Sequence, residues 1–112
     1  MRIYSIHAPD TDHLASVIAE MRKLGRPTIE VVDCGDYYQA LEGSHRLAAA
    51  QALGLTPELI IHEQGDPIDV DAYDWGQENV WPEESYTAGE IAGHLFSAWY
   101  SVPYSFDDEE RE

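Results

Sequence analysis

Cysteine is almost absent from this sequence of 112 residues, in which Cys34 stands alone. A single cysteine excludes an internal disulfide framework and suits the reducing conditions of the cytoplasm. Long apolar runs are missing as well, so no segment could span a bilayer, and the N-terminus lacks the basic start and apolar run of a signal peptide. We therefore expect a cytoplasmic protein without a membrane partner.

Basic residues are also scarce, because six lysines and arginines stand against 22 aspartates and glutamates, for a net charge of −16. The imbalance is greatest in residues 63–112, where Arg111 is the only base. Such a field repels the phosphates of nucleic acids and anionic membranes, which argues against nonspecific nucleic-acid binding. It leaves open a non-catalytic role as a regulatory partner of a basic protein, or as a decoy for DNA-binding proteins.

The residues that are present suffice for one folded domain with a modest core. The hydrophobic fraction is 44%, and three tryptophans are included. This composition is typical of a globular chain and not of a disordered one. We expect residues 1–63 to form the core, and residues 64–112 to form an acidic, aromatic C-terminal extension that packs on the same domain.

Hydrophobic spacing predicts the elements of the first half. Apolar residues recur every three or four positions before Gly25, which indicates an amphipathic helix, and an alanine-rich helix ends at Gly54. β-branched and aromatic segments on either side of a Gly35 turn indicate a hairpin. The order β-α-β-β-α-β predicts an α+β fold with a small mixed sheet packed with helices. The predicted elements cover residues 1–7, 13–24, 28–34, 37–41, 44–53 and 59–61, and the last is a buried strand by its composition.

The second half contains fewer signals. Thr87 to Glu90 matches a capping box, which predicts a C-terminal helix that runs to about Tyr100 and is stopped by Pro103. Residues 65–84 are expected to form a loop held in place by tryptophans, and residues 107–112 a frayed tail.

The clearest chemical signal lies where the second strand of the hairpin passes through Gly43 into the second helix. Gly43 allows a close approach of the backbone, and Ser44 is a good helix cap. The first free N–H groups of a helix, together with its dipole, favour a bound anion. His45 and Arg46 lie in this first turn, where cations are unfavourable unless something negative is bound. The pattern therefore indicates a phosphate-binding site.

The segment Glu42–Gly54, with the sequence Glu-Gly-Ser-His-Arg followed by an alanine-rich helix, resembles the signature of the ParB/sulfiredoxin superfamily. In that superfamily a strand leads through a glycine into a helix opened by a basic pair, and residues 14–32 resemble the helix, turn and strand that precede it. The resemblance covers roughly residues 10–63. It implies a ParB/sulfiredoxin-like fold that binds a nucleotide, ATP or ADP with Mg²⁺, through Gly43, Ser44, His45 and Arg46. Phosphoryl transfer and hydrolysis both stay open.

Each candidate residue has an alternative interpretation. Arg46 could place two donors on a phosphate, or it could form a surface ion pair. His45 could act as a general acid, or it could bond to a neighbouring carbonyl. Glu42 could hold Mg²⁺ through water or act as a base, as the serine kinases of the superfamily would require, or it could be a solvated glutamate at a strand end. Arg26 could reach the nucleotide from the loop before the second strand.

Several activities of the superfamily are not expected. Ser44 occupies the position of the catalytic cysteine of sulfiredoxins, and a hydroxyl cannot replace a thiolate at neutral pH. A helix-turn-helix segment for binding a specific DNA site is missing, so chromosome partitioning is not expected, although a homodimer through the helix 91–99 stays open. No metal site is predicted, because the spacing of the acidic residues does not fit an EF-hand. These residues are Asp66, Asp69, Asp71 and Asp74.

Overall fold

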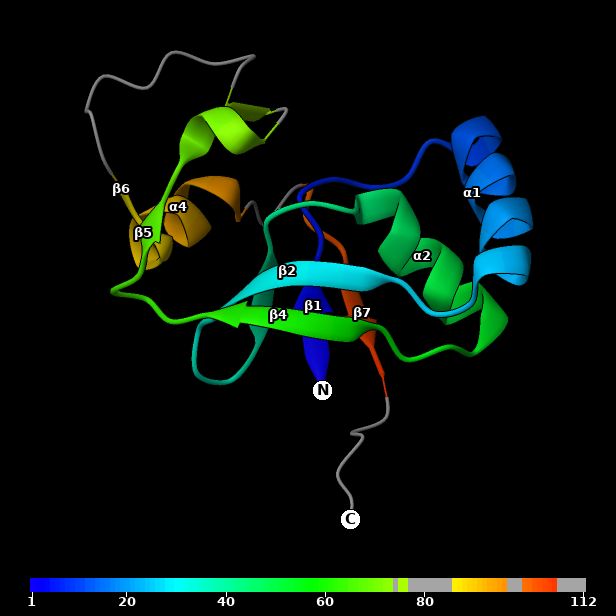
Figure 1. Cartoon of the computed structure of the whole chain (residues 1–112), viewed down its shortest axis with the longest axis horizontal. Helices are drawn as coiled ribbons and strands as arrows, with labels where there is room; N and C mark the ends of the chain where they lie inside the picture. The colour runs from blue at the N-terminus through cyan, green and yellow to red at the C-terminus, as the bar shows by residue number, and fades with distance from the viewer. Residues whose placement is uncertain (74, 77–85, 97–99, 107–112) are drawn as a thin grey trace.

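The computed structural model describes residues 1–73, 75–76, 86–96 and 100–106. Among these residues the fold is a small α+β fold with a mixed five-stranded sheet and three α-helices, which confirms the expected fold class at this level (Figure 1). The elements in chain order are β1 (Arg2–Tyr4), α1 (Thr11–Leu24), β2 (Thr28–Asp33), β3 (Tyr38–Ala40), α2 (Ser44–Leu53), β4 (Glu58–His62), β5 (Pro67–Ile68), the 3₁₀ turn η1 (Val70–Ala72), β6 (Tyr86–Thr87), α4 (Ala88–Leu95) and β7 (Pro103–Ser105).

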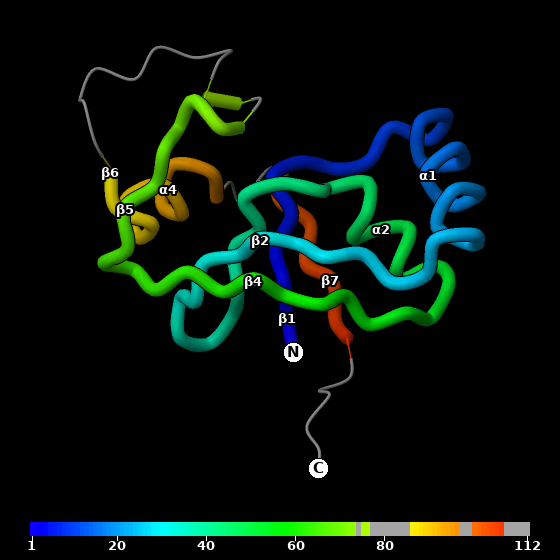
Figure 2. Tube along the Cα trace, viewed as in Figure 1, coloured from blue at the N-terminus to red at the C-terminus, as the bar shows by residue number. Residues whose placement is uncertain are grey.

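The order of strands in the main sheet is β4-β2-β3-β1-β7. β2 and β3 form the predicted antiparallel hairpin, β4 runs parallel to β2, and β1 runs parallel to β3. β7 pairs antiparallel with β1, so the two ends of the described chain lie side by side (Figure 2). Met1 and Phe106 exchange two hydrogen bonds there, because the N-terminal amine donates to the Phe106 carbonyl and the Phe106 N–H donates to the Met1 carbonyl. β5 and β6 form a separate two-stranded sheet.

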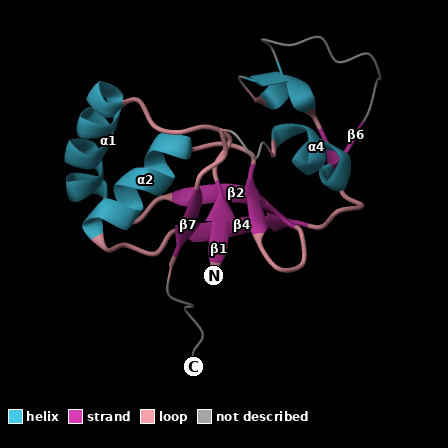
Figure 3. Ribbon diagram, turned by 180° about the vertical axis from the view of Figure 1, so that it is seen from behind, coloured by secondary structure: helices cyan, strands magenta, loops and turns pink. Residues whose placement is uncertain are grey.

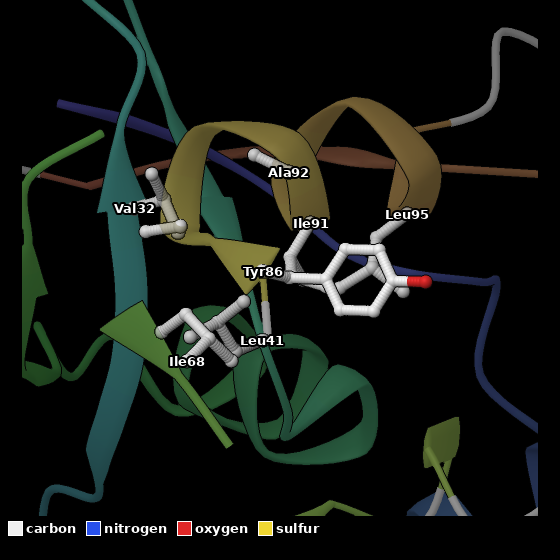
Figure 4. Packing of buried hydrophobic residues seen from close by; sticks show 8 residues of the cluster. Val32, Leu41, Ile68, Tyr86, Ile91, Ala92 and Leu95 are labelled. Carbon is white, nitrogen blue, oxygen red and sulfur yellow. The ribbon is translucent and has the colours of Figure 1, made fainter. Parts of the chain in front are cut away.

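Helices cover the sheet from two sides: α1 and α2 lie on one side and α4 on the other (Figures 1 and 3). Successive side chains of β2 alternate between the two faces. Ile29 and Val31 are fully buried in one cluster with Leu47 of α2. Val32 belongs to a different cluster, which contains Ile91 of α4 (Figure 4). Both faces of the sheet are therefore used, and the second face is covered by residues beyond position 64.

Residues 59–61 differ from the prediction of a buried strand. β4 forms as expected, but it lies at the edge of the sheet, and Ile60 and Ile61 are 49% and 48% exposed. The apolar composition that suggested a buried strand is found instead on a strand that, within the described residues, has a neighbour on one side only. Burial depends on the order of the strands, which this segment does not encode by itself.

The C-terminal helix is shorter than predicted. The capping box at Thr87 is present, with Thr87 and Glu90 bonded in both directions, but α4 ends at Leu95 and Phe96 is extended. Pro103 does not simply stop a helix, because it begins β7. Residues 77–85, 97–99 and 107–112 lie outside the described residues, and so do the parts of the predicted loop, helix and tail that fall there. Among the described helices, none is long and apolar enough to cross a membrane.

Candidate functional site

The N-terminus of α2 is capped by Gly43 and not by Ser44. Gly43 is the N-cap, with φ at 77° and ψ at 35°, and no side chain among the described residues caps the helix. Ser44 is instead the first helical residue and is buried, and its Oγ accepts a hydrogen bond from the Ile6 N–H at 3.2 Å. The hydroxyl therefore ties the segment after β1 to the start of α2, which is why the predicted capping role of Ser44 is wrong.

Gly43 is required at this turn for two reasons. Its positive φ lies in the left-handed region that L side chains rarely adopt. A Cβ at this position would also lie 2.8 Å from Cδ1 of Ile29 and 3.2 Å from Nη2 of Arg46. The Arg46 guanidinium consequently lies across the glycine, in a space that any other residue would fill.

Arg46 turns back toward β2. Its Nη1 donates to the Thr28 carbonyl at 3.0 Å, and its Nη2 lies 3.2 Å from Oε1 of Glu42. The two side chains of this ion pair are 38% and 35% exposed, so water screens the interaction, and pairs of this kind contribute at most about 1 kcal/mol. The ion-pair alternative for Arg46 is therefore the arrangement present in this structure, and Glu42 is its partner.

His45 binds a backbone amide of the neighbouring helix start. Its Nε2 accepts a hydrogen bond from the Asp10 N–H at 2.9 Å. Because an amide can only donate, Nε2 is unprotonated, and the neutral ring carries its proton on Nδ1. Burial, and then the nearby His13 and His7, lower the pKa of His45. As a general acid in this arrangement, His45 could donate from Nδ1 but not from Nε2.

Three histidines meet at this corner of the molecule. The ring centroids of His13 and His45 are 4.4 Å apart, and those of His7 and His45 are 5.7 Å apart. Sequence spacing did not connect these histidines, although a signal was available. His7 follows β1, His13 lies in the first turn of α1 and His45 in the first turn of α2, and the predicted order of elements can bring these three positions together. We call His7, His13, His45 and the N-terminus of α2 the histidine corner.

The two helix N-termini at the histidine corner differ in how their amides are bonded. At α1 the Asp10 carboxylate accepts from the amides of Asp12 and His13, so this N-terminus is already capped. At α2 the amides of Ser44, His45 and Arg46 have no acceptor in the described part of the chain. Unsatisfied amides and the positive end of the helix dipole attract an anion at α2.

Arg26 is exposed in the loop between α1 and β2. It precedes by two residues Thr28, whose carbonyl accepts the Arg46 hydrogen bond. Arg26 is therefore close in the chain to a contact of Arg46. It belongs to a different segment from the three histidines.

Within the described residues, no group of three histidine, cysteine or acidic side chains is arranged to hold a metal ion. Two shallow hollows are found in the same part of the chain, and neither is lined by residues of the histidine corner. One is acidic, with Asp33 and Glu63 in its wall, and the other lies near Gly54 and Phe106.

A second polar cluster surrounds Glu30 on the opposite face of the sheet. Oε1 of Glu30 accepts a hydrogen bond from the Tyr73 hydroxyl at 2.8 Å and lies 3.0 Å from Nε2 of His62. Tyr73 stacks on Trp75 with ring centroids 5.0 Å apart, and the Trp75 indole donates to the Leu41 carbonyl at 2.7 Å. Burial and the Glu30 carboxylate raise the pKa of Tyr73, so the hydroxyl keeps its proton and continues to donate. The sequence did not predict these contacts.

Compared with models of known protein families, with curated proteins and with solved structures, the chain gives no significant match. The ParB/sulfiredoxin resemblance thus stays a hypothesis that rests on the segment Glu42–Gly54 and the elements before it.

Proposed function

We propose that this chain is a ParB/sulfiredoxin-like domain that binds a nucleotide, ATP or ADP with Mg²⁺, with its phosphates at the N-terminus of α2. The main support is the convergence of three imidazoles with three unsatisfied helix amides on a protein whose net charge is −16. Groups that favour an anion are otherwise rare on so acidic a chain. Their concentration at one corner is the feature that a phosphate ligand would explain.

His45 gives this site a dependence on pH. Burial and the mutual repulsion of the three rings lower the pKa of His45. A bound phosphate would favour the protonated ring of His45, and by linkage protonation of His45 would favour phosphate. Affinity is therefore expected to rise as the pH falls through the lowered pKa of His45.

Arg46 and Glu42 take part through an exchange of partners. Because their ion pair is partly exposed, breaking it costs little, and the Arg46 guanidinium can then place two N–H donors on a phosphate. The released Glu42 carboxylate would be available to Mg²⁺ through water, or to an acceptor hydroxyl as a base. Both residues would therefore take up their expected roles only after the ligand has bound, because they are paired with each other before that.

The first test is a thermal-shift titration of the full chain with ATP, ADP, CTP and GTP, each with and without Mg²⁺. A ligand that binds only the folded state stabilises it by about 2.7 kcal/mol at a hundredfold excess over its dissociation constant. That corresponds to several degrees for a domain of this size. In amide NMR spectra, the same titration should shift the resonances of Ser44, His45 and Arg46. Binding that leaves these three amides unchanged would contradict the proposed site.

Four variants sharpen the test. Arg46→Ala should abolish tight nucleotide binding, and unchanged affinity in this folded variant would contradict the proposal.

His45→Gln keeps an acceptor for the Asp10 amide but removes the titrating ring, so it should weaken binding most at low pH. The matched control is His94→Gln, which removes an exposed histidine of α4 and should leave the affinity unchanged. If nucleotide binds, Glu42→Gln then tests whether release or transfer of phosphate depends on this carboxylate.

A non-catalytic role as partner of a basic protein is the second candidate. It is favoured by the hollow whose wall contains Asp33 and Glu63, where two carboxylates could receive a lysine or arginine side chain. Capture of a basic protein that weakens with salt, and that survives Arg46→Ala, would support this role against the first. Asp33→Asn should weaken the capture without affecting nucleotide binding.

A further inference from the structure

The two edges of the main sheet are protected to different degrees. β7 has three residues and begins with Pro103, and short edge strands that contain proline resist pairing with another chain. β4 has five residues, Glu58–His62, with neither proline nor lysine among them. In the described part of the chain, β4 is paired on one side only, and Ile60 and Ile61 are about half exposed. An edge of this kind is a template for a further strand.

The backbone groups available on β4 follow from its pairing with β2. The Glu58 N–H donates to the Pro27 carbonyl at 2.9 Å, so the backbone of Glu58 faces β2. Because orientation alternates along a strand, the same holds for Ile60 and His62 in this parallel ladder. The N–H and C=O groups of Leu59 and Ile61 therefore point away from the sheet.

We infer that β4 pairs antiparallel with β4 of a second copy of this chain, about a twofold axis at Ile60. In this register Leu59 lies opposite the partner's Ile61, and Ile61 opposite the partner's Leu59. Both are hydrogen-bonded pairs, because these are the residues whose backbone groups point outward. Ile60 then faces the partner's Ile60 in the non-hydrogen-bonded pair between them, where side chains approach most closely. The register thus satisfies all four outward backbone groups of each Leu59–Ile61 segment.

The polar side chains of the strand select the same register. Glu58 lies opposite the partner's His62, and His62 opposite the partner's Glu58, so a carboxylate faces an imidazole on either side of the central isoleucine pair. Nε2 of His62 contacts the Glu30 carboxylate, so the ring offers an N–H on Nδ1 to the partner's carboxylate only when both nitrogens carry a proton. A two-residue shift would place Glu58 against the partner's Ile60 and lose this complementarity. Self-complementarity about a twofold axis is the property that an isologous dimer requires, and it favours a second copy over an unrelated peptide.

Long-range charge opposes the dimer and gives it a distinctive response to salt. Two chains of −16 repel each other until salt screens them. Association through β4 should therefore strengthen as ionic strength rises, whereas capture of a basic protein weakens. This response separates self-association from the acidic partner role, and β4 contributes no residue to the histidine corner.

The test is sedimentation equilibrium of the full chain over a wide range of concentration, at low and high salt. A monomer–dimer equilibrium that strengthens with salt is expected. Ile60→Lys places two cations directly opposite each other and should abolish the dimer. The matched control is Leu24→Lys, the same kind of change at an exposed apolar residue of α1, which is 79% exposed and should leave the dimer intact. A chain that is monomeric in every condition, or a dimer that Ile60→Lys leaves unchanged, would overturn the inference.

Cross-linking checks the register independently. In a Cys34→Ala background, Ile60→Cys should give a disulfide-linked dimer under mild oxidation. The Cα atoms of a directly opposed, non-hydrogen-bonded pair are about 4.5 Å apart, which a disulfide can span. Glu58→Cys is the control, because the two copies of this residue would be offset by four positions, roughly 14 Å along the strands. Efficient cross-linking at position 58 but not at position 60 would contradict the proposed pairing.

Discussion

The two faces of the main sheet are held to the rest of the molecule by different forces. On the α1–α2 face the core contacts are apolar, and the Arg46–Thr28 hydrogen bond that joins α2 to β2 is exposed. Ile29 and Leu47 are fully buried, and Ala49 and Ala50 let α2 approach Met21 of α1. On the α4 face an apolar cluster around Val32 is accompanied by the hydrogen bonds that link Glu30 to Tyr73 and Leu41 to Trp75.

The difference concerns distance along the chain as well as chemistry. The helices of the first face come from residues 11–53, between and beside the strands that they cover. The second face is covered by residues that follow every strand of the main sheet except β7. Its two polar contacts join residues that are separated by 43 and by 34 positions in the chain. We conclude that the first face is stabilised mainly by burial, and that the second depends in addition on a few partly buried hydrogen bonds. The following substitutions test this contrast.

The largest loss of stability is expected on the first face. Leu47→Ala removes a fully buried side chain and should lower the free energy of unfolding by about 2–5 kcal/mol, measured by urea denaturation. Leu95→Ala makes the same change at the end of α4, where the side chain is 9% exposed, and should cost less. An equal or greater loss at Leu95 would show that the second face contributes as much burial energy as the first.

Smaller losses are expected at the two glycines that flank α2, Gly43 at its start and Gly54 at its end. Gly43→Ala and Gly54→Ala both place an alanine in the left-handed region, at about 1–2 kcal/mol each. Gly54→Ala meets nothing within 4 Å, whereas a Cβ at Gly43 lies 2.8 Å from Ile29. Denaturation should therefore show a greater loss for Gly43→Ala, and the difference between the two variants measures the close approach of Gly43 to the first face. Equal losses would mean that Ile29 can move aside freely.

Removal of one hydroxyl from each face isolates the directional bonds. Tyr73→Phe deletes the donor to Glu30 and should cost about 1 kcal/mol in urea denaturation. Tyr104→Phe is the matched change within the apolar cluster of the first face, and its hydroxyl has no hydrogen-bond partner in the described part of the chain. That variant should be nearly neutral. If both variants were neutral, the Tyr73 bond would contribute nothing beyond what water supplies in the unfolded chain.

The smallest effect is expected from pH at the histidine corner. The pKa of His45 is lowered from 6.5 in the folded state, so the unfolded chain takes up the proton first as the pH falls. The His45 contribution should therefore be neutral to stability above about pH 6.5 and destabilising below it. Urea denaturation at about pH 7.5 and about pH 5.5 should show a loss on acidification that is smaller in His45→Gln. A loss of the same size in this variant would assign the effect to other groups.

The sequence predicts well those features that depend on neighbouring residues. The β2–β3 hairpin, the helix that ends at Gly54 and the capping box at Thr87 follow from local spacing and turn residues, and all are present. The capping role predicted for Ser44 is wrong because its hydroxyl accepts a hydrogen bond from Ile6, 38 positions away, which no local pattern indicates. The exposure of Ile60 depends on which strands neighbour β4, and that order is a property of the whole sheet.

The candidate site shows the same division. Gly43 and the first turn of α2 could be recognised from the segment alone, but the partners of Arg46 and His45 could not. Glu42 is a sequence neighbour of Arg46, yet the Thr28 carbonyl and the Asp10 amide belong to other elements. The gathering of His7 and His13 around His45 likewise arises only when α1 packs against α2.

The pairing of β1 with β7 has a consequence for how the sheet is assembled. Its contacts join residues about one hundred positions apart, such as Ile3 and Tyr104, which is close to the greatest separation that this chain allows. Closing so long a loop costs entropy that only the completed ladder offsets, and contacts of this kind slow folding. β1 therefore has a stable neighbour on both sides only after the hairpin and β7 are in place. A variant that weakens β7 should consequently speed unfolding more than it slows the formation of the β2–β3 hairpin.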